Sequence, residues 1–348
     1  MDEGKIPWNL LEQITALQGH RNDGVVLGPG IGQDVAIISL TEAVQLALDF
    51  YNCDGPIDLI YKADPITFPT PSPGRYAVIV NSNDIVTAGA LPYGFTATLI
   101  MPPGETEDDI IAIQDEIHRI CSEKRISLLG GHSEVSDAVF RPIVSGSMIG
   151  FVPEEYRVPR KIAPGDQIVC SGWVGAEGTG ILSAEGEIVF GEYFSSVELK
   201  RAAQIGANID ITARTLEINR QFRPRLIHDA TEGGILGAIY ETIVPLGYGA
   251  RLSGDSFPIS DETQRICDIL KVNPLKLISS GAAIFISDPE TCAQIVQHST
   301  DFPANIVGEI LEKDRKITLD GKLVLPPKGD DLIVGLHQLE SMKTSISE

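Results

Sequence analysis

The 348-residue sequence contains few cysteines and no closely spaced ones. The five cysteines are odd in number and include no Cys-x-x-Cys pair: Cys53, Cys121, Cys170, Cys267 and Cys292. This pattern argues against a disulfide framework and a zinc ribbon, and it is typical of a reducing interior. The N-terminal residues lack the regions of a signal peptide, and no apolar run reaches the roughly 18 residues of a membrane span. We therefore expect a cytoplasmic protein that is not inserted in a membrane.

Basic residues are also scarce, with 27 Lys and Arg against 48 Asp and Glu and a formal net charge of −21. Proteins bind a nucleic-acid backbone by neutralising it with Lys and Arg, so we expect no nucleic-acid partner. A small anionic substrate remains compatible with this charge if a metal ion or backbone dipoles counter the field locally. The Gly-Lys-Ser/Thr of a Walker A loop is missing as well.

The remaining composition is that of a folded protein, with 43% hydrophobic and 22% charged residues. The length predicts two domains, and the proline-containing stretch 151–165 places their boundary, giving domains 1–155 and 156–348. Helical and strand patterns alternate with many hairpin-length gaps, which predicts an α+β fold with sheets covered mainly on one face. In the first half we expect strands at 35–40, 44–49, 57–63 and 126–129, the last stopping at Gly130-Gly131, and helices at 76–90 and 107–123.

Glycine next to carboxylate recurs in several short motifs. In the first of them, Gly28–Asp34, backbone amides could approach a phosphate, and Asp34 could hold the metal that bridges its oxygens. Taken alone, this pattern favours a plain tight turn. The second motif, Asn81-Ser82-Asn83-Asp84, interrupts an apolar helix, and burying four small polar residues costs stability unless they are paired. Asp84 facing a Mg²⁺ ion would explain this cost. A cluster that caps the N-terminus of a helix is the alternative.

Two further motifs carry histidine. In 228–234, Asp229 or Thr231 could cap the following helix, and Gly233 and Gly234 could expose amides to an anion; a capped helix without a ligand is the alternative. The segment Gly130-Gly131-His132-Ser133-Glu134 forms a polar cluster after a strand, where His132 fits either a structural or a catalytic role. Asp64 ends a strand before a proline and is an ordinary turn carboxylate unless another group pairs with it.

The order of these motifs along the chain resembles HypE, the hydrogenase expression/formation proteins of the AIR synthase (PurM)-related superfamily. The resemblance rests on Gly30-x-Gly32-x-Asp34, Asp64, Asn83-Asp84-Ile-Val-Thr-Ala-Gly-Ala-Leu-Pro, Gly130-Gly131-x-Ser, Pro164-Gly165-Asp166 and His228-Asp229-Ala230-Thr231-x-Gly-Gly. It covers residues from about 25 to 325. Each motif is short, and their shared order is what carries the resemblance.

The resemblance implies a two-domain PurM-like fold, with an N-terminal α/β domain that forms a dimeric β-barrel in a homodimer and a C-terminal α+β domain. It implies ATP as the nucleotide and Mg²⁺ held by Asp34, Asp64 and Asp84. The residues implied to bind ATP are Gly30, Gly32, Asn83, Thr231, Gly233 and Gly234. The implied catalytic residues on the substrate side are His132, Glu134, His228, Asp229 and Glu232. The chemistry implied is phosphorylation of a carbonyl or amide oxygen, or of a selenide, which turns oxygen into a leaving group.

Several positions depart from the HypE pattern. Where the pattern has lysine, aspartate and arginine, this chain has Glu134, His132 and Glu232, and an Asn-Glu-Gly-Lys segment is replaced by Ser279–Ala282. These changes remove cations and carboxylates, so the electrostatics of the HypE reaction are not preserved. HypE also ends in a cysteine that carries a carbamoyl group, whereas no cysteine follows Cys292 here. We therefore expect no reaction on the chain's own tail unless a partner protein supplies the thiol.

Together these observations predict an ATP-dependent, HypE-like enzyme that activates a carbonyl or amide oxygen of an unidentified small molecule or partner protein. The alternative is a non-catalytic nucleotide-binding or maturation-partner protein that kept the fold and lost the HypE reaction.

Overall fold

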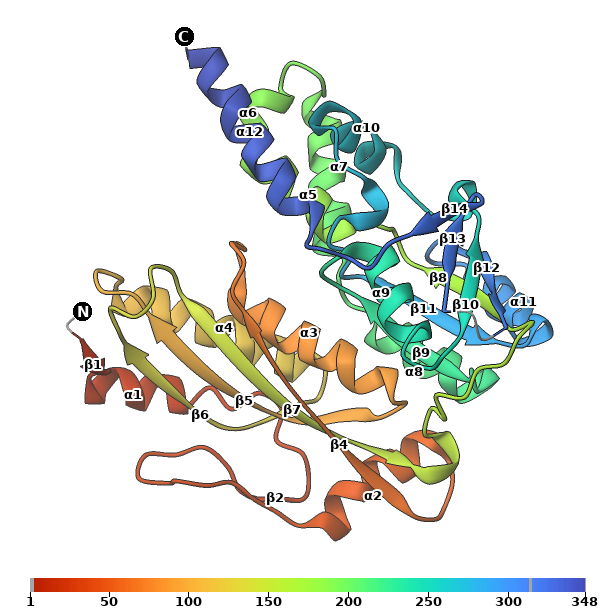
Figure 1. Ribbon diagram of the computed structural model, residues 1–348. Helices are drawn as coiled ribbons and strands as arrows, with labels where there is room; N and C mark the ends of the chain where they lie inside the picture. Colours follow the sequence, from red (N-terminus) through yellow and green to blue (C-terminus); the bar gives the residue numbers. More distant parts are fainter. Residues whose placement is uncertain (1–2, 313–314, 348) are drawn as a thin grey trace. The chain divides into compact units, whose positions relative to one another are not determined.

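The computed structural model describes residues 3–312 and 315–347. The chain divides into two compact units, Met1–Arg157 and Val158–Glu348, and the predicted boundary was after residue 155. Each unit contains its own sheet with helices packed on it (Figure 1). In the described residues, no helix is long and apolar enough to cross a membrane.

Unit 1 is built on a five-stranded sheet in the order β1-β6-β5-β7-β4. Its elements are β1 (Gly4–Lys5), α1 (Trp8–Thr15), β2 (Val25–Leu27), β3 (Ile37–Ile38), α2 (Leu40–Tyr51), β4 (Ile57–Ile66), α3 (Pro73–Thr87), β5 (Leu91–Met101), α4 (Glu107–Glu123), β6 (Ser127–Val135), β7 (Ile143–Pro153) and the short 3₁₀ helix η1 (Glu154–Tyr156). Strand β5 runs parallel to β6 and antiparallel to β7, and β4 closes the sheet at one edge.

The two faces of this sheet are covered unequally. Helix α3 packs on β4, β5 and β7, and α4 packs on α3 and β6; we call this side the helix face (Figure 1). We call the opposite side the open face. The strand register and the two-residue period of strands place five side chains on it: Tyr61, Thr96, Thr98, His132 and Glu134. Helix α2 and the segment from β2 to β3 cover part of the open face through a small apolar core. The rest of that face has no covering element among the described residues.

One predicted strand in this unit is wrong, and another is shorter than predicted. Residues 44–49, predicted as a strand, lie inside helix α2. The alternating apolar residues of that stretch indicated a strand, but the buried positions Ala43, Ala47 and Tyr51 follow the four-residue spacing of a helix. The predicted strand 35–40 is reduced to two residues, Ile37–Ile38.

Strand β6 also differs from its prediction, because it continues through Gly130-Gly131 to Val135. A Cβ at Gly131 would lie 2.2 Å from the carbonyl oxygen of Ala97. Glycine is therefore needed there for close strand packing, and it does not end the strand. His132 and Glu134 consequently lie on a strand and not in a loop after it.

Unit 2 is built on a seven-stranded sheet in the order β14-β13-β10-β12-β8-β11-β9. Its elements are β8 (Gln167–Ser171), α5 (Ala176–Glu185), α6 (Glu187–Phe190), α7 (Ser196–Ala207), α8 (Thr212–Phe222), β9 (Leu226–Ala230), α9 (Gly234–Ile243), β10 (Gly249–Leu252), η2 (Gly254–Ser256), α10 (Asp261–Leu270), η3 (Pro274–Lys276), β11 (Ala282–Ser287), α11 (Pro289–His298), β12 (Ala304–Leu311), β13 (Ile317–Leu319), β14 (Lys322–Val324) and α12 (Asp331–Ser347). The mixed helices and sheets of both units confirm the predicted α+β class.

Helix packing in unit 2 depends on small residues. A Cβ at Gly180 of α5 would lie 2.7 Å from the Cα of Gly206 on α7, so the two helix backbones are in direct contact. Helix α12 follows the motifs described above and was not predicted from the sequence.

Candidate functional site

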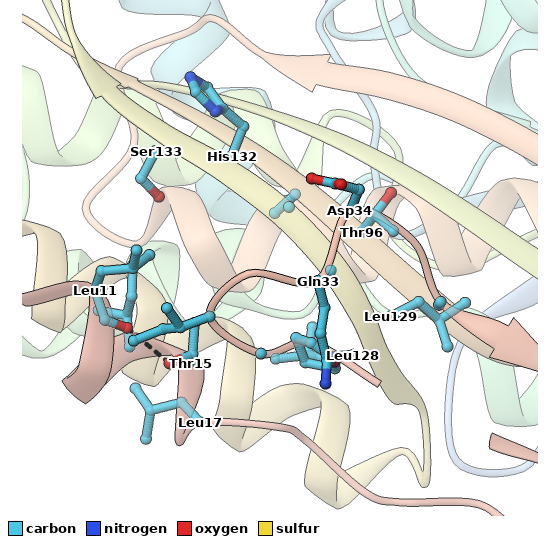
Figure 2. Close-up of a pocket in the computed structure, with 18 of the residues that line it drawn as sticks. Leu11, Thr15, Leu17, Gln33, Asp34, Thr96, Leu128, Leu129, His132 and Ser133 are labelled. Carbon is cyan, nitrogen blue, oxygen red and sulfur yellow. Dashed lines mark hydrogen bonds between the residues drawn. The ribbon is translucent and has the colours of Figure 1, made fainter. Parts of the chain in front are cut away.

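A pocket of about 700 Å³ lies in unit 1 and is lined by the glycine-rich loop, α1 and the strands β5 and β6. Gly30, Gly32 and Asp34 from the loop and His132 from β6 all line it. Figure 2 shows Asp34 beside Thr96 on the open-face side of the sheet, with His132 further along the same strands. The structure thus brings together four of the predicted site residues from two distant segments.

The loop itself is shaped by a turn. The amide of Gln33 donates to the carbonyl of Gly30 at 3.1 Å, and Gly32 has a φ of +75°, a conformation that glycine adopts without strain. The tight turn expected at Gly28–Asp34 is therefore present. It presents Asp34, an exposed carboxylate, at the pocket.

His132 and Glu134 form a pair on the open face. Nε2 of His132 lies 3.1 Å from Oε2 of Glu134, and both side chains are more than a third exposed to solvent. A carboxylate that accepts a hydrogen bond from an imidazole fixes the orientation of the ring. This pair can hold or deliver a proton at the open face of unit 1.

A second polar cluster lies on the helix face. Nζ of Lys62 on β4 lies 3.1 Å from Oδ2 of Asp84 on α3 and 3.7 Å from Oδ2 of Asp64. Lys62 and Asp64 are two residues apart on one strand, so their side chains point to the same face. Two of the three predicted metal ligands therefore meet, with an ammonium group between them.

The polar stretch 81–84 lies inside helix α3, so the predicted alternative of an N-cap cluster is wrong. Asn81 donates to the carbonyl of Ala77 at 2.8 Å, and Ser82 donates to the carbonyl of Val78 at 2.7 Å. Asn81 also donates a hydrogen bond to the carbonyl of Asp64 at 3.2 Å, and this bond connects α3 to β4. Asn83, expected to bind nucleotide, is buried in the same helix.

The three predicted metal ligands lie on different sides of the sheet. Gly146, which pairs with Asp64, faces α3, because a Cβ there would lie 2.5 Å from Nδ2 of Asn81. Asp64 and Asp84 are thus on the helix face, whereas Asp34 lies over the open face. In the described residues no group of three or more His, Cys, Asp or Glu side chains is arranged to hold a metal ion. Within one chain, the residues at 34, 64 and 84 do not form a Mg²⁺ ligand set, and this assignment stays a prediction.

In unit 2, the predicted anion cradle is the turn between β9 and α9. Gly233 is the N-cap of α9, with a left-handed φ of +79° and no side-chain cap, so the predicted caps from Asp229 and Thr231 are not formed. Gly234 donates its amide to the carbonyl of Thr231 at 3.1 Å. A Cβ at Gly234 would lie 2.6 Å from the carbonyl oxygen of Leu275, so this glycine is also required for packing.

A carboxylate of the chain itself occupies this turn. Asp330 accepts hydrogen bonds from the amides of Gly233 at 2.7 Å, Leu332 at 2.7 Å and Ile278 at 3.1 Å. Amides at a helix N-terminus bind anions of many kinds, and a carboxylate here takes the place that a phosphate would need. A phosphate could bind the amide of Gly233 only after Asp330 had moved away.

The remaining predicted residues of unit 2 do not all point to this turn. His228 and Asp229 are consecutive on strand β9, so their side chains face opposite sides of the sheet. Asp229 is buried, His228 is half-buried, and Glu232 is exposed in the turn itself.

The sequence did not indicate a buried glutamate that lies near this turn. Glu177, in the first turn of α5, is 6% exposed, and its Oε2 has no hydrogen-bond partner among the described atoms. Burial raises the pKa of Glu177 to about 7, a hydrogen bond with Ser280 opposes the shift, and the charges of Asp330 and Glu232 add to it. The segment Gly-Ala-Glu-Gly after strand β8 could have drawn attention to it, because an acid among glycines follows the end of a strand.

Two family models match the chain. The AIR synthase related protein N-terminal domain matches residues 32–152, and the AIR synthase related protein C-terminal domain matches residues 163–320. Together these spans cover more than half of the chain. The chain belongs to the AIR synthase related family.

Its similar relatives are hydrogenase expression/formation proteins. A putative protein of this kind from Methanocaldococcus jannaschii is 28% identical over 292 residues, which cover 80% of this chain and 84% of the relative. Carbamoyl dehydratase HypE of Rhizobium leguminosarum bv. viciae is 26% identical over 73% of this chain and 72% of the relative. These matches confirm the predicted HypE-like resemblance.

Solved HypE structures share the fold. HypE of Escherichia coli superposes with a TM-score of 0.75 at 18% identity, covering 94% of this chain and 98% of that one. A HypE in complex with ATP gives a TM-score of 0.65 at 18% identity, covering 91% of each chain. A structure of a HypE–HypF complex gives 0.58 at 22% identity, covering 76% of this chain and 86% of that one. The predicted two-domain PurM-like fold is therefore confirmed.

Proposed function

We propose that this chain is an ATP-dependent enzyme of the HypE-like branch of the AIR synthase related family. It phosphorylates a carbonyl or amide oxygen and thereby converts that oxygen into a leaving group. The observation that carries the proposal is the unit 1 pocket, which gathers Gly30, Gly32, Asp34 and His132. The family membership and the ATP complex of a structurally similar HypE support the choice of nucleotide.

The residues of the open face suit proton handling during such a transfer. The His132–Glu134 pair can accept or return a proton at the substrate, and the loop amides around Gly30 and Gly32 can lie against phosphate oxygens. ATP would arrive as its Mg²⁺ complex, in which the ion offsets phosphate charge. Because one chain does not form the predicted ligand set, we assign no catalytic step to the ion.

We further propose a homodimer formed through the open face of unit 1. Leu59 and Tyr61 on β4 are 53% and 64% exposed, and β4 is an edge strand of the sheet. Exposed apolar residues on a free edge are unfavourable in a monomer and are covered when a second sheet packs against them.

The cysteines support a reducing, cytoplasmic location, because all five are free thiols. They also affect the choice of acceptor. Burial raises the pKa of Cys170, Cys267 and Cys292 to about 12, so these thiols are poor nucleophiles. An oxygen of a small molecule or of a partner protein is therefore the acceptor that we propose; the structure of a HypE–HypF complex supports a protein partner.

The test combines binding and turnover. Titration calorimetry with ATP and Mg²⁺ should show binding to the unmodified protein and at least about tenfold weaker binding to Asp34→Asn, a loss of about 1.4 kcal/mol. Asp137→Asn, which removes the same charge outside the pocket lining, is the matched control. ATP hydrolysis should then be stimulated by an amide- or carbamoyl-bearing compound.

A non-catalytic nucleotide-binding protein is the second candidate, and the exchange of basic residues for Glu134 and Glu232 favours it. Tight ATP binding without hydrolysis in the presence of any substrate or partner would support this alternative. Absence of ATP binding would contradict both functions.

A further inference from the structure

The carboxylate pair on the helix face of unit 1 already has a cation. We infer that the Lys62 ammonium is the resident counter-charge of Asp64 and Asp84 and replaces a divalent ion at this position. The distances of 3.1 Å to Asp84 and 3.7 Å to Asp64 place Nζ between the two side chains. The inference concerns this cluster alone and is independent of the proposed function.

The backbone fixes this arrangement. Asp64 pairs with Gly146 on β7, and the missing side chain at Gly146 makes room for the amide of Asn81, which donates to the carbonyl of Asp64. Asn81 therefore anchors α3 to β4 at this point. Asp84 follows three residues later, on the same side of α3. The carboxylates are held by a strand and a helix, and Lys62 belongs to the same strand as one of them.

Space and charge both oppose a divalent ion there. Mg²⁺ needs oxygen ligands at about 2.0–2.1 Å, and it usually binds one or two carboxylates together with water and phosphate. An ammonium already in contact with the same oxygens must be displaced first. Two carboxylates and one ammonium also leave a net charge of −1, whereas the pair without lysine would have −2.

The size of the effect follows from Coulomb's law. The lysine and both carboxylates are 21–37% exposed, so water screens their interactions. With the dielectric constant of water, a divalent ion about 4 Å from a unit positive charge binds about 30-fold more weakly, which corresponds to about 2 kcal/mol. Removing the lysine charge should restore that factor.

Manganese is a suitable probe because its free aquo ion is counted by electron paramagnetic resonance. Lys62→Met should gain one Mn²⁺ site per chain that is about 30-fold tighter than any at this position in the unmodified protein, and Mg²⁺ should compete for it. Adding Asp84→Asn to Lys62→Met should remove the gain. Lys62→Arg, which keeps the charge, should show none.

Two further variants control for charge removal elsewhere and for misfolding. Lys124→Met, at the C-cap of α4, removes the same charge elsewhere in unit 1 and should leave the Mn²⁺ isotherm unchanged. Lys62→Gln provides a second neutral variant should Lys62→Met fail to fold by circular dichroism. An isotherm identical to that of the unmodified protein in both neutral variants would overturn the inference, as would a gain that survives Asp84→Asn.

Discussion

In unit 1, two carboxylates enclose the ammonium of Lys62, and the three side chains keep 21–37% of their surface in water. In unit 2, three backbone amides enclose the carboxylate of Asp330, and burial raises the pKa of that carboxyl despite those hydrogen bonds. Both places correspond to positions where the family resemblance implies a ligand: a metal ion in unit 1 and a phosphate in unit 2. In both, the chain supplies the complementary charge itself.

The two clusters differ in how many hydrogen bonds hold the charge, and this difference indicates how easily a ligand can replace it. An exposed ion pair contributes about 0–1 kcal/mol, so an ion can compete with Lys62 for its carboxylates at small cost. A half-buried carboxylate that holds three amides is harder to remove, since each amide left without its acceptor costs about 1–3 kcal/mol. We conclude that the unit 1 cluster is suited to exchange and the Asp330 contact is suited to hold the fold.

The largest expected effect comes from breaking the unit 2 contact. Asp330→Ala leaves the amides of Gly233, Ile278 and Leu332 without their acceptor and should lower the free energy of unfolding by about 4 kcal/mol. Urea unfolding followed by fluorescence measures this. In a Trp8→Phe background the sole tryptophan is Trp173, which lies in unit 2 and reports that unit.

The neighbouring aspartate is the matched control for this variant. Asp331 accepts one amide hydrogen bond, from Asn273 at 2.8 Å in an exposed position. Asp331→Ala should therefore cost only about 1 kcal/mol. Equal losses in the two variants would contradict the structural role assigned to Asp330.

The next effect concerns the pH dependence of unit 2. Because burial raises the pKa of Glu177 to about 7 from 4.5 in the unfolded chain, the folded state holds this proton more tightly. The resulting stabilisation is fully present below the unfolded pKa and is lost as the pH rises through the folded pKa. Between about pH 5 and about pH 8 the loss should be about 2.5 kcal/mol.

Glu177→Gln isolates this contribution from the other titrating groups. Glutamine keeps the shape and does not ionise, so the variant should lose about 2.5 kcal/mol less than the parent over the same pH range. Urea unfolding at several pH values, with Trp173 as the probe, gives both slopes. Parallel slopes would show that Glu177 titrates normally in the folded protein.

The sequence predicted regular elements where one periodicity dominates. The helix predicted at 107–123 has the bounds of α4. The prediction failed at residues 44–49, where alternation and helical spacing coincide and only packing on Tyr93 and Phe151 selects the helix. It also ended β6 at Gly130-Gly131, because glycine required by a neighbouring strand is indistinguishable in sequence from glycine in a turn.

The sequence predicted which residue types form the candidate site but not which side chains contact one another. Motif order selected Asp64 and Asp84, and nothing local showed that Lys62 would lie between them. Asp330 follows the last motif by nearly a hundred residues, so its contact with Gly233 depends on tertiary folding. The separation of Asp34 from the other two carboxylates depends on the strand order, which sequence spacing does not determine.

The smallest expected effect is the loss of stability on removing the Lys62 charge in unit 1. Lys62→Met leaves Asp64 and Asp84 facing each other without their cation and should destabilise the contact between β4 and α3 by about 1 kcal/mol, the range of an exposed ion pair. Hydrogen–deuterium exchange of peptides covering β4 and α3 should therefore be faster, and exchange around Gly233 in unit 2 should be unchanged. Saturating Mn²⁺ should restore the slower exchange, because the ion replaces the missing charge. A loss as large as that of Asp330→Ala would instead assign Lys62 a structural role, and the contrast between the two units would disappear.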